Sequence, residues 1–492
     1  MSRSFAPTLF LVGGRTVAFA ATFFIPIVLV RLLSQAEFGT YKQLFLVFAT
    51  LYTIAQFGMA ESLFYFVPQA SREARRYVVH STLFLLGMGV ASLAIILGLR
   101  SAITGVLGND ALGGALPLLG VFVLLMLPSA VLEIVMIARG RYRLASACYG
   151  ASDALRAVFF LAPVLLLGWR IEGLLLGAIA FAVLRLAATL GYLARAFPPA
   201  EQSGAGALAS QLAYAIPFGL AGVLEIAQAT FHQYAVAYRF DAATFAIYAV
   251  GCFQVPLVDF ITSSASNVLM VQLSEDGRRA GAEARAAWHR TVRELALLLL
   301  PLVGLLLVSA RDLVVLLFTA AYLASVPIFM VWSAGILLAV LPVDAVLRVH
   351  AQTRFILGMN ALRLALIVAL LPWCLSAWGL IGAVLATVAA TAVAKAVALR
   401  RVERLLAGPA AALLPWRALG GITAAAGLAA VAALAAGLLD TTMPARLLVT
   451  GLVYGVTYLT LLFVLGVVTE DERAALARRA SRWTQPTVSV AR

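Results

Sequence analysis

Long apolar runs separated by short polar connections repeat along the whole chain. A helix of about 20 apolar residues crosses a bilayer while satisfying its own backbone hydrogen bonds. Every run reaches that length, so the pattern predicts about fourteen transmembrane helices. The predicted segments are 8–31, 41–66, 77–99, 115–138, 144–168, 172–194, 211–238, 242–271, 294–318, 326–348, 355–376, 379–399, 417–439 and 446–468.

The composition excludes a soluble fold of this size. Of the 492 residues, 63% are hydrophobic and 12% are charged, whereas a soluble domain carries about 25% charged residues. The three cysteines are widely spaced within apolar runs, which provides neither a disulfide framework nor zinc-ligand spacing. The sequence therefore predicts an all-α integral membrane protein.

The basic residues predict how the chain is oriented. They cluster in every second connection and in the tail, while the connections between these clusters mostly carry one basic residue each. The clusters include Arg72, Arg75, Arg76, Arg139, Arg141, Arg143, Arg278, Arg279, Arg285, Arg290, Arg293, Arg400, Arg401, Arg404, Arg473, Arg478 and Arg479. Because basic loops stay in the cytoplasm, both termini are expected there. The net charge of +14 thus reflects topology and not nucleic-acid binding.

Two matches at one offset indicate an internal repeat. Arg31, a short turn and Phe38-x-x-Tyr41 reappear as Arg239, a short turn and Phe245-x-x-Tyr248; the stretch from Trp169 resembles the stretch from Trp378. We expect two pseudo-repeated six-helix bundles around a central cavity, plus two C-terminal helices. The predicted domains are 1–195 and 211–400 for the bundles, 196–210 for a cytoplasmic linker, 401–468 for the extra helices and 469–492 for a cytoplasmic tail. Duplicated halves with a site between them suit a transporter that alternates its access.

Four arginines within the apolar runs are candidates for binding an anionic substrate. A charge at this depth costs about 2.5–3.5 kcal/mol, so it should face a cavity or a partner. Arg15, Arg185 and Arg363 have no acidic residue within one helical turn, and Arg156 is three positions from Asp153. The guanidinium matches phosphate oxygens and stays charged when partly desolvated. A purely structural role is the alternative for each.

Other ionisable residues have simpler interpretations. Asp153 with Arg156, and Asp344 with Arg348, have the spacing of ion pairs on one helix face. Three more, Glu61, Glu133 and Lys395, lie near predicted cytoplasmic helix ends, where the charge can reach the membrane interface.

A polar stripe on the seventh predicted helix is a second candidate site. Glu225, Gln228 and His232 are spaced to share one face. Together with Asp259 on the next helix, they are candidates for binding a coupling proton or sodium ion, or for contacting sugar hydroxyls. The alternative for His232 is an interior histidine with a satisfied hydrogen bond.

The sequence contains no catalytic or nucleotide motif that we recognise. Neither lysine follows a glycine, so there is no Walker A loop, and His-Glu-x-x-His, Cys-x-x-Cys and Gly-x-Ser-x-Gly are absent. We therefore expect a protein that is not an enzyme and has no cofactor beyond a coupling proton or sodium ion.

The passage over residues 26–69 resembles bacterial polysaccharide-biosynthesis flippases of the multidrug/oligosaccharidyl-lipid/polysaccharide exporter (MOP) superfamily. The likeness is carried by Arg31-Leu32-Leu33, Glu37-Phe38-Gly39-x-Tyr41, Phe57-Gly58, Pro68 and, later, Leu212-x-Tyr214-x-Ile216-Pro217-Phe218. The resemblance implies two helix bundles that open alternately inward and outward. It also implies an oligosaccharide substrate linked to a polyprenyl diphosphate, and a monomer in the bacterial inner membrane beside a polysaccharide polymerase or export machinery.

Three alternatives remain. A multidrug antiporter of the same superfamily should have an acidic cavity. A membrane glycosyltransferase or polymerase should carry a sizeable external loop with catalytic acids, but the predicted external loop from Arg100 to Gly114 holds one acid, Asp110. A passive scaffold would not need a dozen charges at membrane depth.

Overall fold

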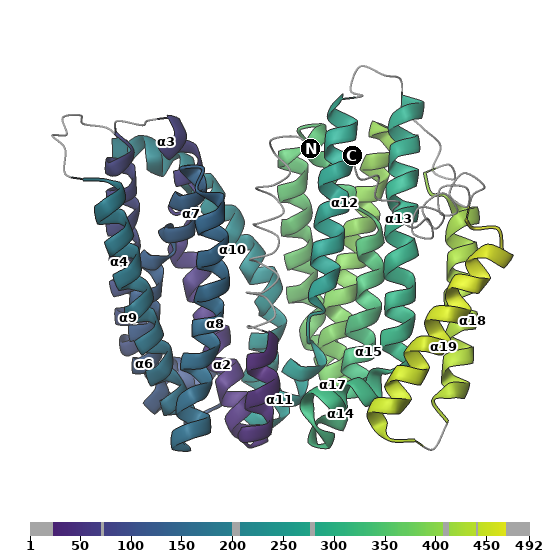
Figure 1. Ribbon diagram of the computed structural model, residues 1–492, viewed down its shortest axis with the longest axis horizontal. Coiled ribbons are helices and arrows are strands. Elements are labelled where there is room, and N and C mark those ends of the chain that lie inside the picture. Colours follow the sequence, from purple (N-terminus) through teal and green to yellow (C-terminus); the bar gives the residue numbers. More distant parts are fainter. Residues whose placement is uncertain are drawn as a thin grey trace, which may run out of the picture. The chain divides into compact units, whose positions relative to one another are not determined.

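The computed structural model describes residues 23–69, 73–198, 207–275, 281–406, 413–438 and 441–468, in which the regular secondary structure is helical and no strand occurs. These residues form two compact units (Figure 1). The first unit comprises Met1–Cys252, Leu317–Ile328 and Asn360–Ala390, and the second unit comprises Phe253–Leu316, Phe329–Met359 and Thr391–Arg492. The predicted domains divide the chain by its internal repeat and not by packing, so their boundaries stay a prediction.

The all-helical membrane fold predicted from the apolar runs is confirmed. Ten helices in the described residues are long and apolar enough to cross a membrane, and two shorter apolar helices are also present. Of the first predicted segment, residues 23–31 fall within the short helix Phe23–Leu32, while residues 8–22 lie outside the described residues. Several other segments are built from two shorter helices each.

The first unit is a bundle in which α4 packs against α6, α6 against α9, and α8 against α9 (Figure 1). Its elements are the helix Phe23–Leu32, α2 (Gln35–Gln56), α3 (Leu63–Gln69), α4 (Ala74–Gly98), α5 (Arg100–Val106), α6 (Leu112–Ser129), α7 (Val131–Ala138), α8 (Tyr142–Leu167), α9 (Ile171–Ala196), α10 (Ala207–Arg239), α11 (Ala242–Gly251) and η1 (Ala320–Ser325).

The first repeated motif forms two capped helices that touch. Ser34 caps α2 in a capping box with Glu37, and the Asp241 carboxylate caps α11 by accepting a hydrogen bond from Thr244 N at 2.8 Å. The two helices pack closely: a Cβ added to Gly39 would lie 1.7 Å from the Ala242 carbonyl oxygen. Glycine at this position therefore lets α2 and α11 approach each other.

The second repeated motif forms two helical hairpins of one kind. Gly168, with φ +65°, ends α8 before Trp169, and Gly379, with φ +56°, follows Trp378. A Cβ on Gly177 would lie 1.9 Å from the Phe159 carbonyl oxygen, and a Cβ on Gly382 would lie 1.9 Å from that of Cys374. The helix α17 (Thr353–Leu405) reverses at Gly379, so it supplies the two predicted segments 355–376 and 379–399.

The second unit is built around α13, which packs against α12 and α18. Trp288 is fully buried there and donates from Nε1 to the Leu413 carbonyl at 2.9 Å. Its further elements, besides the outer parts of α17, are α12 (Pro256–Glu275), α13 (Gly281–Val308), α14 (Ala310–Phe318), α15 (Val326–Gly335), η2 (Ile336–Val340), α16 (Val343–Val349), α18 (Trp416–Ala436) and α19 (Met443–Val464).

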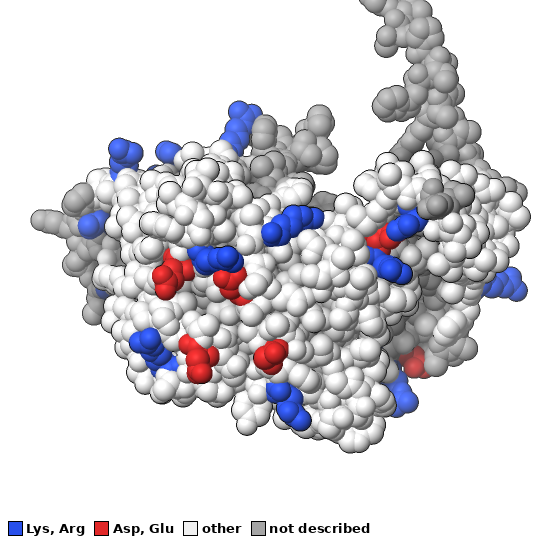
Figure 2. Space-filling model, turned by 90° about the horizontal axis from the view of Figure 1, so that it is seen from below, with Lys and Arg blue, Asp and Glu red and all other residues white. Residues whose placement is uncertain are grey.

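The outer surfaces of both units are apolar. Leucines such as Leu166 and Leu438 are 80% and 86% exposed. Figure 2 shows the molecule from below, towards helix ends, where basic and acidic side chains lie among uncharged ones. Water would disfavour so much exposed apolar surface, whereas lipid chains accept it. The protein is therefore a multi-pass membrane protein.

Candidate functional site

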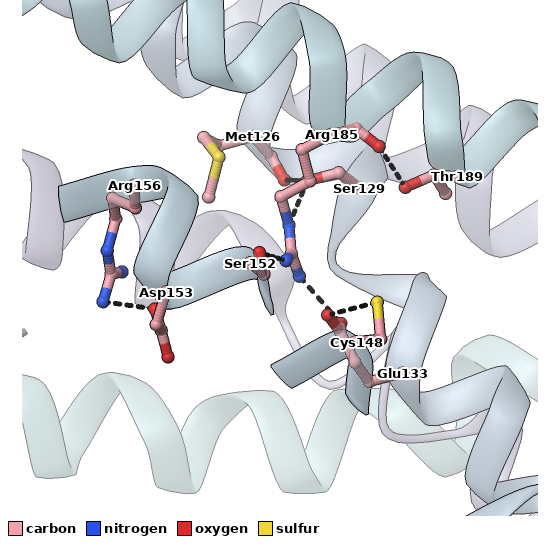
Figure 3. Close-up of polar contacts among 9 residues, drawn as sticks. All are labelled: Met126, Ser129, Glu133, Cys148, Ser152, Asp153, Arg156, Arg185 and Thr189. Atoms are coloured by element: carbon pink, nitrogen blue, oxygen red, sulfur yellow. Dashed lines mark hydrogen bonds and ion pairs between the residues drawn. The ribbon is translucent and has the colours of Figure 1, made fainter. Parts of the chain in front are cut away.

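A buried polar cluster lies in the first unit where the end of α6 and helices α7, α8 and α9 meet (Figure 3). The Arg185 guanidinium on α9 donates from Nη2 to Glu133 Oε2 at 2.7 Å and from Nε to Ser129 Oγ at 3.2 Å. Its Nη1 donates to Ser152 Oγ on α8. Cys148 Sγ contacts the other carboxylate oxygen of Glu133 at 3.5 Å. Three elements thus contribute polar partners to one arginine on a fourth.

The position of this cluster along the helices places it deep in the membrane. Arg185 is the fifteenth residue of the 26-residue α9, which at 1.5 Å per residue puts it about 21 Å from the start of the helix. On α8, Cys148, Ser152 and Arg156 follow one another at i, i+4 spacing, so they lie along one helix face.

The Arg185–Glu133 ion pair is closed to solvent. The two side chains are 14% and 3% exposed. Removing one member of such a pair leaves an uncompensated buried charge, which costs about 3–5 kcal/mol. The expectation that Glu133 reaches the membrane interface was wrong, because Arg185 holds its carboxylate inside the bundle. Arg185 was predicted to bind the substrate. In the structure its guanidinium donates to side chains of the protein itself.

A second ion pair lies one turn further along α8. Arg156 Nη2 is 2.5 Å from Asp153 Oδ1, with the two side chains 27% and 22% exposed, so the predicted bridge within this helix is confirmed. One turn beyond Arg156 on α8, the Phe160 ring packs against Phe45 of α2, with ring centroids 5.7 Å apart. The helix that carries Arg156 therefore lies beside α2 inside the first unit.

The remaining arginines are placed as follows. Arg15 lies outside the described residues. Arg363 is half-buried on α17 and, like His232, belongs to the first unit. The structure thus brings Arg156 and Arg185 into one region, and the predicted substrate contacts of all four arginines stay a prediction.

The polar stripe on α10 divides by burial. Glu225 is exposed, whereas Gln228 and His232 are buried. His232 Nδ1 shares a hydrogen bond of 2.7 Å with Tyr248 Oη on α11, which matches the alternative of a satisfied interior histidine. Asp259 belongs to the second unit, so its predicted grouping with the stripe stays a prediction.

A polar cavity of about 380 Å³ in the second unit was not predicted as a group. Asp259 lines it together with Asp344, Arg348 and Lys395, and hydroxyl and amide side chains of α12 complete the wall. The polypeptide between η2 and α16 is non-helical at Leu341, and Lys395 Nζ donates to the Leu341 carbonyl at 2.9 Å. The sequence signal was Pro342, which interrupts an apolar run and frees carbonyl groups.

The structural comparisons place this fold among transporters. A lipid II flippase MurJ in an inward closed conformation matches with a TM-score of 0.68 at 13% identity, covering 92% of this chain and 99% of that chain. An inward-facing multidrug resistance MATE family transporter of the MOP superfamily matches with a TM-score of 0.60 at 14% identity, covering 80% and 98%. A MOP superfamily transporter from Pyrococcus furiosus matches with a TM-score of 0.56 at 15% identity, covering 81% and 94%.

The chain thus has the fold that the MurJ flippase and the MATE transporters share. No curated protein sequence matches this chain. The family model for "Polysaccharide biosynthesis protein" matches residues 28–327, which is more than half of the chain. The chain therefore belongs to the polysaccharide biosynthesis protein family, as the resemblance of residues 26–69 indicated.

Proposed function

We propose that this protein moves an oligosaccharide repeat unit linked to a polyprenyl diphosphate from the cytoplasmic to the periplasmic leaflet of the bacterial inner membrane, without catalysing a reaction. Its family membership and its MurJ-like fold support a lipid-linked substrate. The observation that carries the proposal is the partly exposed Arg156–Asp153 pair in the same region as Arg185, whose three guanidinium nitrogens each have a partner within the protein.

The two pairs differ in how readily they can exchange partners. Arg185 has three polar partners from three elements, so its guanidinium is fixed. Arg156 is held by a carboxylate on its own helix, and such pairs contribute only about 0.2–0.5 kcal/mol on an exposed helix surface. A diphosphate offers more negative charge and more acceptor oxygens than Asp153, so it can replace this carboxylate during passage.

The cavity of the second unit complements this site chemically. Its carboxylates, hydroxyls and amide suit sugar hydroxyl groups, and Asp259 or Asp344 is a candidate for carrying a coupling proton or sodium ion. Within the proposal, Arg156 contacts the diphosphate and the second unit's cavity contacts polar parts of the cargo or the coupling ion. Alternating opening of the two bundles then carries the cargo across.

A multidrug antiporter is the second candidate, because MATE transporters share the fold. Exporters of organic cations need acidic groups toward their cargo. In the first unit the two acids that contact the candidate arginines, Glu133 and Asp153, are each paired with an arginine. This pairing leaves no net negative charge at these residues to attract a cation, which favours the flippase.

The direct test follows the lipid-linked repeat units in cells that lack this protein. We expect these units to accumulate in the cytoplasmic leaflet, and surface polymer to be lost. Restoring the wild-type gene should reverse both effects, whereas Arg156→Ala, inserted at normal abundance, should restore export poorly. Normal leaflet distribution of the repeat units combined with a loss of drug resistance would contradict the proposal and favour the antiporter.

A further inference from the structure

A hollow of about 630 Å³ lies at one end of the first unit, away from the buried ion pairs. It is lined by the beginning of α2, the beginning of α6 and the turn between α8 and α9, including Glu37, Trp169, Arg170 and Glu172. Its volume falls within the range of about 300–1,000 Å³ found for small-molecule sites. The positive-inside pattern predicts that this end faces away from the cytoplasm.

The wall of this hollow holds a fixed aromatic surface. Gly168, with φ +65°, ends α8 and begins the turn. Trp169 then folds back over Gly173, where an added Cβ would lie 2.3 Å from the tryptophan Cβ and 3.3 Å from ring atom Cε3. Glycine at position 173 thus accommodates the indole, which nevertheless stays 51% exposed. The ring is supported from one side and open on the other.

Charged groups surround the aromatic surface. Glu37 Oε2 accepts hydrogen bonds from Ser34 N and Ser34 Oγ, both at 2.8 Å, and from Arg170 Nη1 at 2.7 Å. Oε2 accepts all three of these hydrogen bonds, and Oε1 accepts none of them. Arg170 is 62% exposed, and Glu172 is also exposed. Two carboxylates and one guanidinium give the hollow a formal charge of −1, which disfavours an anion.

We propose that this hollow binds one uncharged pyranose ring of the oligosaccharide, such as a neutral hexose or an N-acetylhexosamine. A pyranose has an apolar C–H face that can lie on an indole, and hydroxyl groups at its edge that can donate to carboxylates and accept from a guanidinium. The assignment of the sugar to the cargo rests on the proposed function. The hollow is then a subsite for the sugar part, on the side where the cargo leaves, and separate from the diphosphate contact.

The competing interpretation is that Trp169 only anchors the protein at the membrane interface, as exposed tryptophans commonly do. The chain contains a matched control. Trp378 is also 51% exposed, stands beside a glycine of positive φ and occupies the equivalent place in the internal repeat. It does not line the hollow. An interfacial role predicts the same effect for both tryptophans, whereas a sugar subsite predicts an effect for Trp169 alone.

The test uses the full chain in lipid nanodiscs and saturation-transfer NMR. The probes are methyl N-acetyl-β-D-glucosaminide, methyl α-D-glucoside and glucuronic acid. We expect saturation of the ring protons of at least one neutral glycoside and none for the uronic acid. Trp169→Ala should lower the signal about fivefold, while Trp169→Phe and Trp378→Ala should retain it. Glu172→Gln, at an exposed position, should lower it about twofold without affecting folding.

Three results would overturn the subsite: no saturation of either neutral glycoside, equal losses in the Trp169→Ala and Trp378→Ala proteins, or preferred binding of the uronic acid. The binding signal does not depend on transport, so the subsite and the proposed function fail separately. Glycoside binding at Trp169 in a protein whose deletion leaves lipid-linked repeat units normally distributed would contradict the flippase and retain the subsite.

Discussion

Arg185 and Glu133 show how an arginine at membrane depth can be stabilised by partners within the protein. The pair is buried, and two serine hydroxyls accept hydrogen bonds from the other two guanidinium nitrogens. Water therefore solvates neither charge well, and each charge is compensated by the other. This interdependence makes the pair a stability element first, and any substrate contact of Arg185 would have to compete with it.

Removing one member of this pair should destabilise the protein strongly. We expect Arg185→Ala or Glu133→Ala to lower the free energy of unfolding by about 3–5 kcal/mol, because the partner is left charged and buried. The double variant Arg185→Met/Glu133→Leu should recover much of this loss. Thermal unfolding in detergent measures the effect.

Arg170→Ala is the control for this comparison, since it breaks the exposed pair with Glu37 and should cost at most about 1 kcal/mol. Additive effects of the two buried substitutions would contradict the argument. Export by a stable double variant would show that Arg185 is not needed for binding the diphosphate, whereas loss of export from it would return Arg185 to the substrate contacts.

Asp153 should act as a competitor of the substrate for Arg156. Asp153→Asn removes the carboxylate that occupies the guanidinium, so we expect tighter binding of a polyprenyl diphosphate, by about two- to threefold. Arg156→Ala should weaken binding about tenfold, since a charge-assisted hydrogen bond is lost. Tryptophan fluorescence titration in nanodiscs measures both. Weaker binding by the Asp153→Asn protein would mean that Asp153 orients Arg156 instead of blocking it.

Individual charges were easier to predict than their partners. Arg185 was recognisable from the sequence as a charge inside an apolar run, and the Asp153–Arg156 pair followed from helical spacing. Glu133 stands 52 positions before Arg185, and no local pattern connects them, because their contact depends on how α7 and α9 pack. The cavity of the second unit was missed for the same reason.

The repeated motifs lie at helix ends and where helices cross. Both α2 and α11 begin at a capped turn, and they cross where Gly39 meets the backbone of Ala242. Sequence patterning therefore identified elements that share a structural role. The bends were less visible: the predicted segment 115–138 is split between α6 and α7 at Ala130, two residues after Pro128, and the apolar pattern alone does not place that break.

A methyl group at the α2–α11 crossing should force the helices apart. Gly39→Ala would put a Cβ 1.7 Å from the Ala242 carbonyl oxygen, and such overpacking costs about 1–3 kcal/mol. Gly87→Ala in α4 is the matched control, because nothing lies within 4 Å of its added Cβ and alanine favours helix. We expect a lower melting temperature for the first variant and an equal or higher one for the second. Equal melting temperatures for both variants would show that the crossing is not tight.

The cap of α11 should give the protein a small pH dependence. Hydrogen bonds from the Thr244 side chain and backbone hold the pKa of Asp241 below its usual value. A lowered folded-state pKa means that the cap contributes fully above the unfolded pKa, about 3.9, and is lost as the pH falls through the folded value.

Asp241→Ala should therefore lower the melting temperature at pH 7, by the equivalent of about 0.5–2 kcal/mol, and the difference from wild type should shrink toward pH 3. Asp241→Asn keeps a capping oxygen without an ionisable proton, so it should stay near wild type at pH 7 and lose nothing specific below pH 4. A loss in the alanine variant that is constant from pH 7 to pH 3 would contradict an ionised cap.

The two compact units of the chain do not coincide with the two repeated halves of its sequence. The hairpin motif of the second half, Asn360–Ala390, packs within the first unit, and the predicted bundle from 211 to 400, which divides the chain by its repeat, stays a prediction. Local likeness at a fixed offset identifies duplicated elements, but it does not say which helices pack together. That information lies in contacts between distant segments, such as Trp288 with Leu413.

Export of an anionic cargo should depend on the membrane potential. Moving one negative charge out of a negative compartment releases about 2.3 kcal/mol per 100 mV, so a diphosphate with two charges gains about 4.6 kcal/mol. The sequence has no Walker A loop, and this gain needs no nucleotide. In proteoliposomes loaded with a lipid-linked repeat unit, a potassium diffusion potential that is negative on the side of the cargo should speed translocation severalfold. The reversed potential should slow it, and ATP should change nothing.

The Arg156→Ala protein should be slower at both polarities while keeping the same direction of voltage dependence, because the charge that moves belongs to the cargo. A rate that ignores the potential but follows an imposed proton or sodium gradient would instead assign the driving force to ion exchange. The carboxylates Asp259 and Asp344 of the second unit's cavity would then be the residues to substitute next, and neutralising the responsible one should uncouple translocation from that gradient.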